Sequence, residues 1–259
     1  MDIRSYNREA WNREVEGGEN RWSQPVDSET IAKARQGEFS ILLTENIPVP
    51  HRWFPPLKGA DVLCLASGGG QQGPVLAAAG ANVTVFDNSP AQLKQDQLVA
   101  QRESLSLRTV EGDAADLSIF ADESFDLVFN PVSTVFMPDV PTVWRECARV
   151  LRPGGVLMTG FMNPVHYIFD LYKADEGTLE VANSIPYSDL TSIPQEVLEE
   201  HIEKGLPVEF GHSLTDLLGG QLHAGFVITD LYEDYMLDSP LHTYHPSYMA
   251  TRSIKIRDT

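Results

Sequence analysis

Residues 61–73 of the 259-residue chain have the sequence DVLCLASGGGQQG. After Asp61 the first residues are apolar throughout, as in a strand that is buried on both faces of a parallel sheet. The glycines that follow let the backbone approach a ligand closely, and the free N–H groups at the start of a helix favour an anion or a carboxylate. This stretch therefore predicts a strand, a tight turn and a helix start, with a ligand bound over the turn.

Strands and helices alternate in the residues after this turn. We expect strands at residues 61–66, 82–86, 107–111, 125–130 and 155–161, and helices at residues 74–79, 90–103 and 140–151. The helix at 90–103 has the clearest start, because Ser89 can cap it, Pro90 occupies its first position and Gln92 can complete a capping box. Such alternation predicts a parallel sheet with helices on both faces.

The end of the chain breaks this alternation. A helix at 213–222 precedes strands at 226–232 and 248–256, and the loop 233–247 between them has no helical pattern. Without a crossover helix these last two strands should be antiparallel. The expected fold is a three-layer α/β domain of Rossmann-like type. Its seven-stranded sheet is mostly parallel with an antiparallel last strand, and helices lie on both faces.

Two sections lie outside this pattern. Residues 1–58 are polar, with a short helix expected at 5–15, and we expect them to form an N-terminal lid or cap segment. The remaining domain, residues 59–259, contains a less regular region at about 163–210, which we interpret as a lid insertion.

Composition limits the classes of partner. The chain has 37 acidic and 19 basic residues, a net charge of −18, and no Lys/Arg cluster. Nucleic-acid binders usually carry a basic stripe, so DNA and RNA are poor candidate substrates. A neutral or cationic small molecule fits better, although the charge can equally serve solubility alone.

Other features indicate a cytoplasmic protein without membrane contact. No apolar run approaches the roughly 20 residues of a membrane span, and the first residues lack the apolar stretch of a signal peptide. Cys64 and Cys147 lie in apolar segments, which favours buried reduced thiols.

The glycine turn by itself fits two classes of enzyme. Gly68, Gly70 and Gly73 match the dinucleotide pattern G-x-G-x-x-G, and Asp87 ends the second strand nineteen residues after Gly68. An acidic residue at that place grips ribose hydroxyls. A nicotinamide or flavin enzyme and a methyltransferase both satisfy this pattern.

The following motifs separate the two classes. The sequence resembles the class I S-adenosylmethionine-dependent methyltransferases, of the methyltransferase-11-like small-molecule type, over residues 60–162. The segments that carry the resemblance are residues 62–70, 85–93, 111–117, 124–128 and 149–155. Each is weak alone, but their order and spacing together are specific.

The resemblance implies S-adenosylmethionine as cofactor and S-adenosylhomocysteine as product. Ser67, Gly68 and Gly70 would line the methionine end, Asp87 would accept both ribose hydroxyls, and Asp113 would accept from the adenine amino group. The full implied set is Ala66, Ser67, Gly68, Gly69, Gly70, Asp87, Asn88, Gln92, Gly112, Asp113, Ala114, Asn130, Pro131 and Val132.

Two residues depart from the family pattern. Cys64 stands where the family usually has an acidic residue that helps to hold the cofactor's amino group, and Ala66 replaces a first glycine. The missing acid suggests that another group holds the amino group or that affinity is reduced. Ala66 is only one methyl larger than glycine, so the turn can survive.

Methyl transfer mainly requires alignment of donor and acceptor, so a catalytic residue is optional. His166, just after the fifth strand, is the candidate general base, with a packing role as the alternative. Tyr6, Trp11, Trp22 and Trp53 are candidates for a substrate lid, and ordinary packing is their alternative. We expect no metal site, since His242 and His245 with Glu233 resemble a solvated loop.

We therefore expect an enzyme that transfers a methyl group from S-adenosylmethionine to a small-molecule nucleophile. The alternatives are an NAD(P)-dependent Rossmann oxidoreductase and a non-catalytic module that binds S-adenosylmethionine. The sequence determines neither the acceptor nor the oligomeric state.

Overall fold

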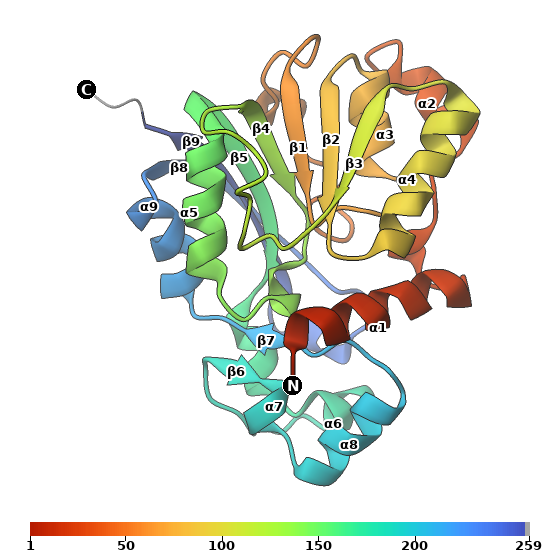
Figure 1. Cartoon of the computed structure of the whole chain (residues 1–259). Helices are drawn as coiled ribbons and strands as arrows, with labels where there is room; N and C mark the ends of the chain where they lie inside the picture. The colour runs from red at the N-terminus through yellow and green to blue at the C-terminus, as the bar shows by residue number, and fades with distance from the viewer. Residues whose placement is uncertain (257–259) are drawn as a thin grey trace.

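A seven-stranded sheet forms the centre of the computed structural model, which describes residues 1–256 (Figure 1). The strand order is β3-β2-β1-β4-β5-β9-β8, and among these seven β9 alone runs in the direction opposite to the other six. This confirms the expected Rossmann-like sheet with an antiparallel last strand. The predicted domain also included residues 257–259, which lie outside the described part. The strands are β1 (Asp61–Leu65), β2 (Asn82–Asp87), β3 (Leu107–Glu111), β4 (Phe125–Asn130), β5 (Leu151–Met162), β8 (Phe226–Asp234) and β9 (Tyr248–Lys255).

Helices cover both faces of the sheet, because successive strand residues point to opposite sides. In β4, Leu127 and Phe129 join the apolar cluster under α2, α3 and α4, whereas Val128 joins the cluster under α5. Both faces are therefore buried, as the apolar strands require. The helices are α2 (Ser28–Ala34), α3 (Gln72–Ala78), α4 (Pro90–Glu103), α5 (Val140–Val150) and α9 (Gly220–His223), with a π-helical turn at Thr215–Gly219 before α9.

The start of α4 confirms one expectation and corrects another. Ser89 caps the helix, since its Oγ accepts from the Gln92 N–H at 3.1 Å. The reciprocal half of the capping box is wrong: the Ser89 N–H donates to Asp87, and the Gln92 side chain donates to Ser23 instead. Gln92 is thus directed towards the glycine turn rather than back along its own helix.

The N-terminal section divides into two parts with different surroundings. Helix α1 (Ile3–Gly17) lies across the carboxyl ends of the strands (Figure 1). Most of residues 28–58 instead pack behind the sheet, where Ile31, Ala34 and Trp53 are all fully buried. The sequence did not predict α2, because seven residues are too few for a clear helical period.

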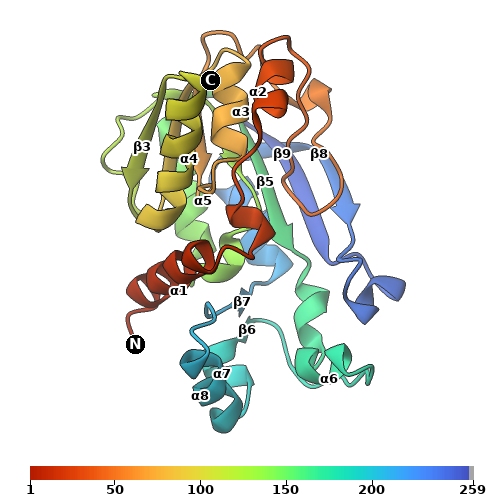
Figure 2. The ribbon, with the colours of Figure 1, turned by 90° about the vertical axis from the view of Figure 1, so that its right-hand side faces the viewer.

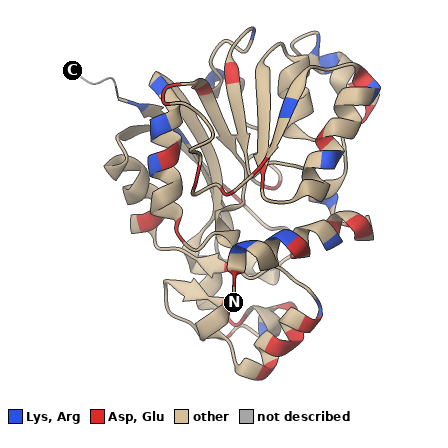
Figure 3. Cartoon of the chain, in the orientation of Figure 1, with Lys and Arg blue, Asp and Glu red and all other residues tan. Residues whose placement is uncertain are grey.

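Residues 164–211, called the lobe below, lie beyond the carboxyl ends of the strands. Figures 1 and 2 show α1 between the lobe and the sheet. The lobe contains only short elements, which are α6 (Leu171–Asp175), β6 (Tyr187–Ser188), α7 (Asp189–Ser192), α8 (Gln195–Glu203) and β7 (Phe210–Gly211). Acidic residues gather on the exposed side of α8 (Figure 3), as expected for a solvated helix face. Among residues 1–256, no helix combines the length and the apolar character that crossing a bilayer requires.

Candidate functional site

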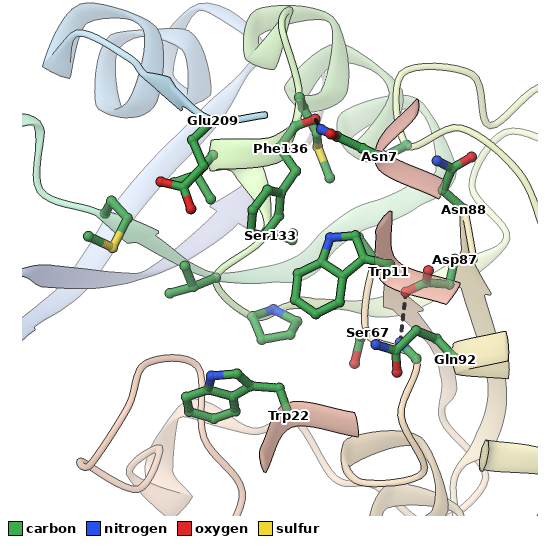
Figure 4. A pocket seen from close by; sticks show the side chains of 18 of the residues that line it. Asn7, Trp11, Trp22, Ser67, Asp87, Asn88, Gln92, Ser133, Phe136 and Glu209 are labelled. Atoms are coloured by element: carbon green, nitrogen blue, oxygen red, sulfur yellow. Dashed lines mark hydrogen bonds between the residues drawn. The ribbon is translucent and has the colours of Figure 1, made fainter. Parts of the chain in front are cut away.

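A cavity of about 530 Å³ runs along the carboxyl ends of β1, β2 and β4 and beneath α1 and the lobe. One part, called the turn half below, is lined by Ala66, Ser67, Gly68, Asp87, Asn88, Gln92, Gly112, Asp113 and Ala114. The other part, the lobe half, is lined by Glu45, Phe136, His166, Tyr167, Glu209 and Tyr248. In the view of Figure 4, Asp87 and Glu209 lie on opposite sides of the Trp11 indole. Open α/β sheets bind ligands at this edge of the sheet.

The turn after β1 has an unusual backbone. Ala66 adopts a left-handed conformation with φ of 46°, which costs a residue with a Cβ on the order of 1 kcal/mol. Gly69 has φ of 118°, and a Cβ there would lie 2.4 Å from the carbonyl oxygen of Trp22. The turn therefore accepts alanine at position 66 but requires glycine at position 69.

Asp87 connects this turn to the end of β2. Its Oδ2 accepts from the Gly68 N–H at 2.9 Å, and its Oδ1 accepts from the Ser89 N–H at 2.9 Å. Burial raises the pKa of Asp87, and these backbone donors oppose that shift. A carboxylate has about four lone-pair positions, so Asp87 can still accept from a ligand in the cavity.

Asn88 and Asp113 form the outer end of the turn half. The Arg4 side chain donates to the Asn88 side-chain oxygen at 3.2 Å, and Asn88 donates back to the Arg4 carbonyl at 2.9 Å. The Arg4 guanidinium also lies 3.8 Å from the Asp113 carboxylate. The start of α1 thus closes this end of the cavity.

Most of the predicted cofactor residues line the cavity, including Pro131 and Val132 after β4. Three do not. Gly69 and Gly70 face Trp22 and α4. Asn130 is fully buried and holds three strands together, because it donates to the Leu65 carbonyl and accepts from the Thr159 hydroxyl. Asn130 was predicted to lie beside the methyl group, but its role in the structure is to connect these strands.

Comparisons with known proteins agree with this geometry. Residues 63–159 match the family model described as a methyltransferase domain. The chain is 49% identical to the uncharacterized methyltransferase YbaJ of Bacillus subtilis, over 97% of this chain and 98% of that protein. The chain belongs to the S-adenosylmethionine-dependent methyltransferases. This decides between the two enzyme classes that the glycine turn left open, against the oxidoreductase.

Two further matches extend the same result. A ubiquinone biosynthesis O-methyltransferase of Pseudomonas syringae is 32% identical over 54% of this chain and 62% of its own length. An S-adenosylmethionine-dependent methyltransferase from Mesorhizobium loti has the same fold, with a TM-score of 0.60 at 16% identity over 79% of this chain and 94% of that one. The cofactor of the present chain is therefore S-adenosylmethionine.

A buried acid from α4 supports the glycine turn from beneath. Asp96 is fully buried, and its Oδ2 accepts from the Gly69 N–H at 3.0 Å. Burial raises the pKa of Asp96 to about 8, and hydrogen bonds from the N–H groups of Gly70 and Gly69 oppose that shift. Asp96 also raises the pKa of the buried Cys64 thiol, after burial itself. An acid at position 64 would place two carboxyl groups together in a dry site, which would raise the pKa of at least one of them.

Sequence reasoning missed Asp96 because nothing in a helix interior marks a buried acid. The only available signal was the absence of the family acid at Cys64. Asp96 lies 32 residues further along the chain than Cys64, and only the packing of α4 against the turn brings it there.

The four aromatic candidates for a lid separate into two pairs. Trp11 and Trp22 line the cavity, and Trp11 packs edge-on against Phe136 with ring centroids 5.0 Å apart. Tyr6 does not line it, because its hydroxyl faces outwards and donates to the Leu206 carbonyl of the lobe. Trp53 is fully buried behind the sheet and donates to Asp230 on β8. Trp53 is therefore a core residue and not part of a lid, whereas Tyr6 joins α1 to the lobe without lining the cavity.

His166 lines the lobe half, as its place after β5 suggested. Its side chain is 5% exposed, and its Nδ1 has no hydrogen-bond partner among the described residues. Burial, helped by nearby His245, lowers the pKa of His166 to about 4. The ring is therefore neutral at physiological pH.

The acidic and phenolic groups of the lobe half were not predicted. Tyr167 donates to Glu209 Oε2 at 2.7 Å, and Tyr248 donates to Glu45 Oε2 at 2.9 Å. Glu45 is separately paired with Arg21 at 3.0 Å. No local pattern joins these residues, which lie up to 203 positions apart.

The loop with Glu233, His242 and His245 gives no metal ligand set. Within residues 1–256, no group of three or more His, Cys, Asp or Glu side chains could hold a metal ion. His242 and His245 instead contact the carbonyl oxygens of Ser239 and Pro246.

Proposed function

We propose that this methyltransferase acts on a small-molecule nucleophile within the cavity between the sheet and the lobe. The observation that carries the proposal is the enclosure of the cavity by α1 and the lobe. Its volume of about 530 Å³ lies within the range of roughly 300–1,000 Å³ typical of small-ligand sites. The Pseudomonas relative, named an O-methyltransferase of ubiquinone biosynthesis, supports the same class.

The turn half fits S-adenosylmethionine, which supplies a methyl group on a sulfonium sulfur. A Cβ at Gly68 would lie 2.6 Å from the Gln92 Cβ, so the turn leaves no room for a larger residue there. The buried Gln92 Oε1 has no hydrogen-bond partner among residues 1–256. We propose that Gln92 Oε1 accepts from the amino group of the cofactor, in place of the acid absent at Cys64.

The other proposed contacts follow the order of the strands. Asp87 at the end of β2 would accept from the ribose hydroxyls, and Asp113 after β3 from the adenine amino group, with Asn88 bordering the ring. Ser67 and Gly68 would line the methionine end, with Ala66, Gly112, Ala114, Pro131 and Val132 completing the walls. Gly69 and Gly70 would act through the backbone shape of the turn.

We propose that α1 and residues 163–210 form the substrate lid. Asn7 of α1 donates to the carbonyl oxygens of Phe136 and Val208 at 3.1 and 3.0 Å. The helix is therefore joined to both the sheet edge and the lobe, and it excludes water from the space between them. Most of residues 28–58 pack in the core of the domain, but Leu42, Leu43, Thr44 and Glu45 also line the cavity.

The site would accelerate methyl transfer mainly by aligning the cofactor and the acceptor, and such alignment can lower the activation barrier by roughly 7–11 kcal/mol. His166 is poorly suited to be a general base, because a group with a pKa of about 4 accepts a proton weakly at neutral pH. We propose that His166 positions the acceptor through a hydrogen bond.

The test is calorimetric titration of the full chain with S-adenosylhomocysteine, followed by methyl transfer from labelled cofactor to fractionated extracts. We expect binding, and label in the low-molecular-mass fraction. No binding at millimolar ligand contradicts the cofactor site, and label only in protein or nucleic acid contradicts the small-molecule acceptor. Binding without transfer to any fraction would support the non-catalytic alternative.

A further inference from the structure

The charges around the cavity are strongly unequal. Among the described residues that line it, Glu45, Asp87, Asp113, Asp139 and Glu209 are acidic, whereas Arg4 is the single Lys or Arg. Arg4 lies at the Asn88 end of the turn half, where it bonds to Asn88 and lies near Asp113. The lobe half therefore presents carboxyl groups without a lining cation.

Glu209 is the least compensated of these carboxyl groups. Glu45 has Arg21 as a partner, but no Lys, Arg or His within residues 1–256 lies within 4.0 Å of Glu209 in an ion pair. Tyr167 donates to its Oε2, and Oε1 receives no hydrogen bond from the described residues. One carboxylate oxygen next to the cavity is thus free to accept from a ligand.

The groups that face Glu209 are acids and phenols. Asp189 of α7 accepts from the Glu209 backbone N–H at 2.7 Å. Burial raises the pKa of Glu209 to about 7, the Tyr167 hydroxyl lowers it, and Asp189 raises it further. The remaining ionisable neighbours are Tyr172, Tyr187 and Tyr248, with His201 3.9 Å from Asp189.

Aromatic rings occupy the space next to this carboxyl group. Asn7 bonds to both Phe136 and Val208, so it holds the Phe136 ring and the neighbouring Glu209 at the same end of the cavity. Figure 4 shows Glu209 beside Phe136, with Trp11 on the other side of that ring. A carboxylate beside the faces of aromatic rings is a favourable environment for a cation.

We propose that the methyl acceptor is an amine, which enters as an ammonium ion and is held between Glu209 and the aromatic walls formed by Trp11, Phe136 and Tyr167. This inference rests on the proposed function, since it names the substrate class of the same cavity. An ammonium ion supplies the positive charge that the lobe half lacks, and it donates to the free oxygen of Glu209.

The chemistry requires a proton to leave before transfer. The bound ammonium gives one proton to the Glu209 carboxylate, which leaves a neutral amine and a protonated Glu209. The amine nitrogen then uses its lone pair to form the new N–CH₃ bond as the methyl–sulfur bond breaks, with that bond's electron pair left on sulfur. The methylated product carries the positive charge, and the proton on Glu209 passes to water when the product leaves.

A carboxyl group with a pKa near 7 suits this role, because it can be ionised to hold the cation and can then keep the proton. An ordinary exposed carboxylate, with a pKa of roughly 4.3, is a weaker base than Glu209 and would take the proton from the ammonium less readily.

The test uses probes of one shape and three charges, namely 2-phenylethylamine, 2-phenylethanol and phenylacetate. Binding to the full chain saturated with S-adenosylhomocysteine is measured by calorimetry, at up to roughly 10 mM because fragments of this size bind weakly. We expect the amine to bind at least about 10-fold more tightly than the other two, as for a hydrogen-bonded ion pair. Glu209→Gln should remove this preference.

Glu196→Gln on the exposed face of α8 is the matched control, since it removes one negative charge from the same lobe but outside the cavity. It should leave the preference for the amine unchanged. Far-UV circular dichroism and affinity for S-adenosylhomocysteine verify the fold of both variants.

Tyr167→Phe gives an independent measurement if Glu209→Gln does not fold. Loss of the hydroxyl should raise the pKa of Glu209 further, so the pH midpoint for amine binding should move up from about 7. At pH 9 its affinity should approach that of the unmodified protein. A purely structural role for Tyr167 would lower affinity equally at all pH values.

The proposal is overturned if the alcohol or the carboxylate binds as tightly as the amine, if no amine binds, or if Glu209→Gln keeps the preference. If S-adenosylhomocysteine still binds in these cases, only the amine proposal fails and the proposed methyltransferase function stands. Loss of that binding in the unmodified protein would instead contradict the proposed function.

Discussion

The turn half and the lobe half of the cavity are assembled in different ways. Ser67, Asp87 and Asp113 follow β1, β2 and β3, and parallel strands place their ends at one edge of the sheet. Glu45, Tyr167, Glu209 and Tyr248 come from a loop, the lobe and the antiparallel strand β9, which no common element aligns. A local order of motifs therefore specifies the first half, whereas long-range packing specifies the second.

The difference explains what each half can vary. Most residues of the turn half lie at or just after a strand end that the sheet also needs, and Gln92 comes from the first turn of α4. The lobe is made of short elements, and short elements tolerate substitution and insertion more readily than the strands they join.

The largest expected effect is on stability, and it concerns Trp53, which belongs to neither half of the cavity. Trp53→Ala should lower the free energy of unfolding by ~3–5 kcal/mol, because it removes a fully buried indole from the core. Urea unfolding measures the loss. Trp11→Ala, in the wall of the cavity, should cost about 1 kcal/mol or less. Equal losses would contradict the separation of the two tryptophans.

Asp87→Ala tests the turn half directly. The affinity for S-adenosylhomocysteine should fall by at least about 100-fold, near 3 kcal/mol, since hydrogen bonds to a charged group are lost and the Gly68 N–H loses its acceptor. Calorimetry measures the effect. Asp116→Ala, an acid that lies outside the cavity, is the control and should bind normally. Unchanged binding in Asp87→Ala would contradict the proposal that Asp87 binds the cofactor.

Asp96→Ala tests whether α4 supports the turn. The Gly69 N–H would lose its acceptor, and we expect a loss of roughly 10-fold in affinity for S-adenosylhomocysteine. Asp96→Asn retains an acceptor oxygen and should lose less. Calorimetry of both variants, with urea unfolding as a measure of stability, makes the comparison. If the two variants lose affinity equally, Asp96 does not act through this hydrogen bond.

Ala66→Gly should have the smallest effect. It restores the residue usual in the family and relieves the left-handed backbone, while the unfolded chain gains freedom, so the net stabilisation should be about 0.5 kcal/mol. The thermal midpoint should rise by a few degrees at most. A lower midpoint would show that the Ala66 methyl group makes contacts worth more than the strain.

The sequence alone determined the sheet, the turn and the residue types along its edge. Alternating apolar strands and helices allow few topologies, and the loop without a crossover helix made the last strand antiparallel. Asp87 and Asp113 could be assigned because a strand end places its next residue at the sheet edge. Boundaries were less certain, as in the predicted helix 213–222, which begins with a π-helical turn.

Only the tertiary structure decided which side chains meet across long separations. It placed Asn130 between strands, Trp53 in the core and Asp96 under the glycine turn, although the residue types gave no sign of this. It also brought Glu209 next to Tyr167, and joined both to α1 through Asn7. Motifs record what the backbone must do locally. Contacts between distant segments depend on packing, which many sequences can satisfy and which no short pattern encodes.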